Sequence, residues 1–141
     1  KYKNDYTLKF FQIILAKQKM LSRCGWGINL ISMNHRGELF LCDSVLNMEQ
    51  FKIGDLDTGL DWSKFTVPLV EARNPCQTCW AKYICGGTCF VGSWITNGDI
   101  SSIDPVECEL NKFLIETSLN LVCRLIAARV NLNYLKTFLA G

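Results

Sequence analysis

The sequence lacks a long uninterrupted apolar run, and we therefore expect no membrane-spanning helix. Its most apolar stretch, residues 119–130, is broken by Arg124 and Arg129, whereas a span needs roughly 20 apolar residues. Residues 1–9 also lack an apolar segment followed by a small-residue cleavage site, so the chain as given carries no secretory signal. These absences favour a reducing, cytoplasmic compartment and a protein without membrane contact.

An excess of one charge is missing as well. The chain has 15 Lys and Arg against 13 Asp and Glu, a net charge of +2. Such a balance creates no broad basic surface, so we expect no nucleic-acid partner. The 141 residues, 49% of them hydrophobic, are enough for one domain with its own core. Because the chain starts at Lys1 without a methionine, we expect it to be a fragment of a longer protein.

Cysteine, by contrast, is abundant, and half of the eight cysteines crowd into one short segment. They are Cys76, Cys79, Cys85 and Cys89, with two, five and three residues between neighbours. This spacing is too tight for four unstrained disulfides to separate partners. A two-residue gap lets two thiolates meet one metal, and the pair Gly86-Gly87 allows close backbone approach to a bulky inorganic group. The segment 75–89 therefore predicts a metal-binding knuckle.

The hydrophobic pattern predicts an α+β fold around this knuckle. Apolar residues at helical spacing indicate an N-terminal helix over residues 4–21. Residues 28–33 and 38–42 indicate the strands of a β-hairpin around the turn 34–37, and residues 51–56 add a short extended piece.

Two further helices are predicted from capping signals. Asp61 is a candidate N-cap for a helix over residues 62–72, which Pro68 would weaken or bend. A long C-terminal helix, residues 105–138, begins with Asp104 as N-cap, Pro105 in its first turn and Glu107 at the capping-box position.

The C-terminal helix is apolar on two sides, so it calls for two packing partners. One set of apolar positions consists of Leu110, Leu114, Leu121, Leu125, Ala128, Leu132 and Leu135. A second set consists of Ile115, Leu119, Val122, Ile126 and Val130. The second partner is either another part of a larger protein or a second copy of the chain, so a dimer is possible.

The ordered cysteines and one glycine give the pattern Cys24, Gly37, Cys42, Cys76, Cys79, Cys85, Cys89 and Cys108. This pattern closely resembles the SPASM domain, the auxiliary iron-sulfur cluster domain of radical SAM enzymes that mature peptides and proteins, such as anaerobic sulfatase maturases and thioether-forming maturases. The resemblance spans residues 24–108. It implies a leading helix at 1–23 that links to a missing radical SAM barrel, and a C-terminal helix at 109–141.

The resemblance implies two [4Fe-4S] clusters with interleaved ligands. The first would be held by Cys24, Cys42 and Cys89. The second would be held by Cys76, Cys79, Cys85 and Cys108. No extra cysteine lies between Cys24 and Gly37, so the first cluster is expected to have an open iron for a substrate group, or for His35 or Asp43. His35 is the only histidine, and its place in the predicted turn favours a polar turn residue over a ligand.

Radical SAM chemistry itself needs a Cys-xxx-Cys-xx-Cys motif. Cys85 and Cys89 supply the first interval, but Gly92 stands where the third cysteine should be. We therefore expect no catalytic residue and no S-adenosylmethionine site in this chain; that cofactor would bind the barrel of the parent enzyme. The implied role is electron transfer or binding of a peptide or protein substrate, as part of an oxidoreductase.

Two other interpretations of the cysteines stay open. A structural zinc module that binds a partner protein needs only one tetrahedral thiolate site, and zinc can replace a cluster lost during purification in air. A disulfide-stapled domain predicts that Cys24 pairs with Cys42 across the hairpin. Cys123, the eighth cysteine, lies outside the pattern, and we expect it to pack in the core as a small apolar residue.

Overall fold

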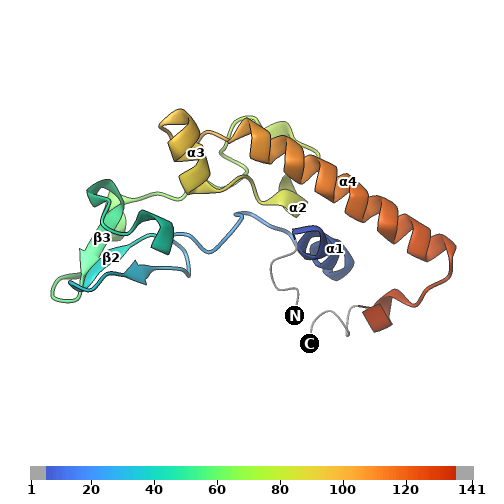
Figure 1. Cartoon of the computed structure of the whole chain (residues 1–141), viewed down its shortest axis with the longest axis horizontal. Helices are drawn as coiled ribbons and strands as arrows, with labels where there is room; N and C mark the ends of the chain where they lie inside the picture. The colour runs from blue at the N-terminus through green and yellow to red at the C-terminus, as the bar shows by residue number, and fades with distance from the viewer. Residues whose placement is uncertain (1–5, 136–141) are drawn as a thin grey trace.

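The structure, a computed structural model, describes residues 6–135, and their side chains from residue 8 onward. A small sheet lies at one end of the molecule and a pair of packed helices at the other, with the segment 76–97 between them (Figure 1). The predicted α+β class is confirmed as a mixture of helices with an antiparallel sheet.

The sheet has four strands in the order β1-β2-β3-β4, each antiparallel to its neighbour. The predicted hairpin is confirmed with shorter strands, because Ser32 pairs with Phe40 and Met33 pairs with Leu39. Gly37 closes the turn with a φ of 78°, which favours glycine. The strands are β1 (Ser32–Met33), β2 (Glu38–Phe40), β3 (Lys52–Asp55) and β4 (Gly59–Leu60).

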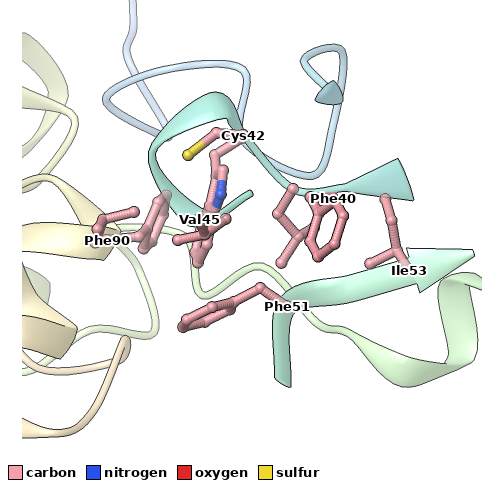
Figure 2. Close-up of a cluster of buried hydrophobic side chains, with 9 residues drawn as sticks. Phe40, Cys42, Val45, Phe51, Ile53 and Phe90 are labelled. Atoms are coloured by element: carbon pink, nitrogen blue, oxygen red, sulfur yellow. The ribbon is translucent and has the colours of Figure 1, made fainter. Parts of the chain in front are cut away.

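The core beside the sheet is rich in aromatic residues. Figure 2 shows Phe40, Cys42, Val45, Phe51 and Ile53 of the sheet region with Phe90 from the helical segment facing them. Trp26 belongs to the same core and is 1% exposed. The sheet and the segment after Cys89 are therefore held together by hydrophobic burial.

Helix α1 (Tyr6–Ala16) packs against the long helix α4 (Pro105–Ala127). Phe10 and Ile13 of α1 share one core cluster with Ile115 of α4. The prediction that the first helix reaches residue 21 is wrong, because Lys17 has a φ of 55° and ends it. The predicted positions 4 and 5 lie outside the described residues.

The N-terminus of α4 is as predicted. Asp104 caps the helix, since its carboxylate accepts hydrogen bonds from the backbone N–H groups of Val106 at 2.9 Å and Glu107 at 3.1 Å. The predicted C-terminal extent is wrong: the helix ends at Ala127, and Arg129 follows with a φ of 54°. A separate helical turn spans 132–135, and residues 136–138 lie outside the described range.

The predicted helix over residues 62–72 is also wrong. Asp61 does cap this segment by accepting from the Ser63 N–H at 3.1 Å, but only the 3₁₀ turn Trp62–Lys64 forms. Pro68 lacks an N–H and disfavours helical backbone in the residue before it, which explains the early end.

Three short helices occupy the cysteine-rich segment. They are the 3₁₀ turn η4 (Cys76–Thr78), α2 (Lys82–Cys85) and α3 (Phe90–Asn97). The predicted turn after Asn97 is confirmed, because Gly98 ends α3 with a φ of 72°. In residues 6–135 no helix is both long enough and apolar enough to cross a bilayer.

Candidate functional site

Three cysteines of the knuckle segment and one from the start of α4 line one cavity. Cys76 begins η4, Cys79 follows it, Cys85 ends α2 and Cys108 lies in the first turn of α4. The remaining wall residues are Ala81, Lys82, Gly87, Thr88 and Lys112. We call this the knuckle cavity. Its four cysteines are the set that the resemblance to the SPASM domain implies for a second cluster.

Cys76 is buried in the wall of the knuckle cavity, and Cys79, Cys85 and Cys108 are half-buried there. Burial raises the pKa of Cys85 to about 11 and also raises the pKa of Cys76 and Cys108. These thiols are therefore protonated at neutral pH in the chain without metal. A metal would have to displace their protons, which makes its binding dependent on pH.

The knuckle cavity is small as it stands, with a volume of about 20 Å³. In residues 6–135 no three His, Cys, Asp or Glu side chains are grouped closely enough to hold a metal ion in their present positions. The donor set fits thiolate ligation, which is the chemistry of iron-sulfur and structural zinc sites. A single ion would need the thiols drawn together, and a cluster would need the walls to move apart.

Two glycines fix the shape of the knuckle after Cys85. Gly86 and Gly87 have φ values of 72° and 88°, which favour glycine. A Cβ on Gly86 would lie 2.8 Å from the backbone of Ser22, and a Cβ on Gly87 would lie 2.7 Å from Nη1 of Arg73. The knuckle therefore packs directly against the segment that leads into Cys24.

The first predicted set, Cys24, Cys42 and Cys89, is arranged differently. Cys42 is buried, whereas Cys24 and Cys89 are exposed. Their chain neighbours meet in the aromatic core: the rings of Trp26 and Phe90 stack with centroids 4.6 Å apart, and Cys42 lies in the same cluster. The structure thus brings the three surrounding segments together without grouping the three thiols as metal ligands.

A buried polar atom in this aromatic core fits a sulfur-rich site. The indole N–H of Trp26 is buried and has no hydrogen-bond partner within the described part of the chain. Most buried donors are satisfied, so an orphan of this kind calls for an acceptor. Trp26 shares its core cluster with Cys42, and hydrogen bonds from the protein to sulfur tune iron-sulfur potentials.

Glu107, which precedes Cys108 in α4, contacts the chain at Cys89 and next to Cys24, and so links the segments of the two cysteine sets. Its carboxylate accepts a hydrogen bond from the backbone N–H of Cys89 at 2.9 Å and forms an ion pair with Arg23 at 3.0 Å. Arg23 also donates to Asn111 at 3.2 Å. The capping-box role predicted for Glu107 is not what the structure shows, because the backbone N–H of Asp104 donates to Thr88 instead.

Other candidate residues lie apart from these contacts. His35 is exposed in the hairpin turn, as a polar turn residue would be. Asp43 is also exposed, and its carboxylate accepts a hydrogen bond from Ser44. Cys123 is exposed on α4, so the prediction that it packs in the core is wrong. Its helical position faces outward, one residue beyond the buried Val122.

A larger cavity, of about 540 Å³, lies beside β3 and β4. No cysteine lines it, and acidic side chains of Glu49, Asp55 and Asp61 alternate with Lys52 and Lys64. This mixture of charges selects no particular ligand, so the knuckle cavity remains the better candidate.

Sequence comparison adds no relative to this description: no family model matches the chain, and no curated protein does.

Proposed function

We propose that this chain is an auxiliary iron-sulfur domain, in the manner of a SPASM domain, that serves a radical SAM enzyme acting on a peptide or protein. The observation that supports it is the knuckle cavity. Cys76, Cys79, Cys85 and Cys108 were grouped by the resemblance, and the same four line one cavity in the fold. Cys76, Cys79 and Cys85 are neighbours in the sequence, so the informative member is Cys108, which the fold brings to them from the first turn of α4.

The chain's own residues have distinct tasks in this proposal. The knuckle cavity would hold one [4Fe-4S] cluster, and Cys24, Cys42 and Cys89 would hold the other. Bound clusters supply one-electron transfer. The stacked rings of Trp26 and Phe90 exclude water beside Cys42, and the Trp26 N–H offers a hydrogen bond to sulfur.

The domain would act with the radical SAM barrel of its parent enzyme, where S-adenosylmethionine binds. It would accept an electron from the peptide or protein substrate, or bind that substrate at the open iron of the first site. Neither task needs an acid or a base from this chain. A reducing cytoplasm suits the eight thiols, all of which are free in the structure.

A structural zinc module is the second candidate, and the volume of the knuckle cavity favours it. A volume of about 20 Å³ is near the space that one water-sized species needs. Four thiolates are also a common ligand set for structural zinc. A zinc module would stabilise a surface that binds a partner protein, without electron transfer.

Metal analysis of the anaerobically prepared chain tests both candidates. We expect about eight irons and as many sulfides per chain, with cluster signals in the low-temperature EPR spectrum after reduction. Stoichiometric zinc with no reconstitutable iron would replace the first candidate by the second. Eight free thiols with neither metal bound would remove both.

A further inference from the structure

Arg73 is a fully buried cation whose hydrogen bonds all go to neutral oxygens. Its side chain is 0% exposed. One terminal nitrogen donates to the carbonyl of Thr88 at 3.0 Å, and the other donates to Ser93 Oγ at 3.1 Å and to the Ser102 carbonyl. Within residues 6–135 no carboxylate forms an ion pair with it. A buried charge without a counter-charge is costly, so Arg73 calls for an anion.

The guanidinium of Arg73 lies directly behind a wall of the knuckle cavity. Gly87 and Thr88 form that wall, and both touch Arg73: a Cβ on Gly87 would lie 2.7 Å from Nη1, and the Thr88 carbonyl accepts its hydrogen bond. On its other side the guanidinium carbon lies 4.8 Å from the ring centroid of Phe90. Arg73 therefore contacts both the wall of the knuckle cavity and a ring of the aromatic core.

Cysteines of the knuckle cavity are close enough to Arg73 to act on it electrostatically. Burial lowers the pKa of Arg73, and Cys76 and Cys85 are the largest influences that raise it. Both cysteines line the knuckle cavity. Metal ligation requires deprotonated thiols, so a bound metal centre would bring negative charge to the place where Arg73 lacks it.

We infer that Arg73 is a positioning residue whose charge compensates the anionic cluster in the knuckle cavity and makes that cluster easier to reduce. The inference rests on the proposed function. One-electron reduction adds one negative charge to the cluster, and a nearby buried cation stabilises the more negative state. Its effect falls off with distance, and Cys76 and Cys85 are the cysteines that act on Arg73, so the cluster held by Cys24, Cys42 and Cys89 should feel it less.

The test is a potentiometric titration, followed by EPR, of the anaerobically reconstituted chain with Arg73 replaced. Arg73→Gln removes the charge, and we expect the midpoint potential of the knuckle cluster to shift to more negative values, with a smaller shift of the other cluster. Arg73→Lys keeps the charge and should stay near the wild type. Ser93→Ala is the matched control, because it removes one hydrogen bond to Arg73 and leaves the cation in place.

The variants separate charge from packing. If Arg73→Gln fails to retain iron, recovery of iron in Arg73→Lys supports the inference. Equal behaviour of Arg73→Lys and Arg73→Gln, whether both lose iron or both keep the wild-type potential, overturns it, as does a Ser93→Ala shift as large as that of Arg73→Gln. A wild-type chain that forms no cluster removes the proposed function and this inference together, whereas a loaded wild type with an unshifted Arg73→Gln removes the inference alone.

Discussion

The two cysteine sets differ in what brings them together. The knuckle set comes from one short segment and the first turn of α4, and its members line a common cavity. The set of Cys24, Cys42 and Cys89 comes from three separate segments, and two of its members are exposed. Local spacing accounts for three of the four knuckle cysteines, whereas the other set depends on the aromatic core and on the contacts of Glu107.

This difference shows that the order of cysteines in a sequence and the packing that brings distant cysteines together are separate properties. The spacing of Cys76, Cys79 and Cys85 places them near one another over a few residues, whatever the rest of the fold does. The segments that carry Cys24 and Cys89 meet where Phe90 packs on Trp26. Segments that are held together by an aromatic core can be separated by substitutions in that core, even where no cysteine is changed.

The largest expected effect is the loss of one cluster when a cysteine of either set is replaced by serine. Cys85→Ser should abolish the knuckle cluster and leave the other, and Cys42→Ser should do the reverse, so that each variant retains about four irons. The EPR signal lost should differ between the two variants. Cys123→Ser is the control, since this exposed thiol lies outside both sets, and it should keep all the iron. Loss of both clusters in either variant would show that the sets are not independent.

A truncation in the aromatic core should weaken the sheet side of the molecule. Phe90 is 1% exposed and stacks on Trp26, so Phe90→Ala should lower the free energy of unfolding by about 3–5 kcal/mol. Urea unfolding followed by tryptophan fluorescence measures it. Ile95→Ala on the same helix is the control: Ile95 is 70% exposed, and its loss should change stability by about 0.5 kcal/mol or less. Similar losses from both would mean that the aromatic core does not support the site.

Two glycines with the same φ angle test whether the knuckle packs tightly against residues 22–23. Gly86 and Gly98 both have a φ of 72°, but a Cβ on Gly86 would meet the backbone of Ser22 and Arg23, while a Cβ on Gly98 would meet nothing within 4 Å. Gly98→Ala should cost about 1–2 kcal/mol through left-handed strain alone. Gly86→Ala should cost about 2–4 kcal/mol, because the close contact adds to that strain. Equal losses in thermal or urea unfolding would refute the tight contact between the knuckle and residues 22–23.

The smallest expected effect is a pH dependence confined to the sheet. Hydrogen bonds from Asn34, Lys52 and Arg36 lower the pKa of Glu38 from 4.5 to about 2. A lowered carboxyl pKa stabilises the fold at pH values above 4.5, and this contribution is lost as the pH falls towards 2. Wild type and Glu38→Gln should therefore differ in stability at neutral pH and converge over that window. A constant difference between them down to pH 2 would contradict the assignment.

Turn and capping residues in the sequence correctly predicted the elements whose ends depend on those residues alone. The hairpin turn at residues 34–37 and the Asp104–Pro105 start of α4 were both confirmed. The early ends of α1 at Lys17 and of α4 before Arg129 were missed, because both residues adopt left-handed backbone without being glycine. Such a conformation is chosen by tertiary packing, which a pattern of apolar residues does not encode.

The candidate site divides in the same way. The spacing of the cysteines predicted a knuckle of Cys76, Cys79, Cys85 and Cys89, and the resemblance placed Cys108 with the first three, which is the set that lines the knuckle cavity. Neither gave any sign of the two buried arginines, Arg73 at 0% exposed and Arg23 at 8% exposed. Charged residues are rarely buried unless they are paired. A buried arginine therefore cannot be predicted from the sequence before its partners are known.

The knuckle cavity also has a consequence for synthesis of the chain. Translation proceeds from the N-terminus, so all four strands of the sheet have been made once Leu60 has been added. The cavity needs Cys108 and Lys112 as well as the knuckle, and it cannot close until α4 begins to leave the ribosome. During that interval Cys76, Cys79 and Cys85 are unshielded on a nascent chain. Newly made protein is then most open both to metal delivery and to oxidative damage.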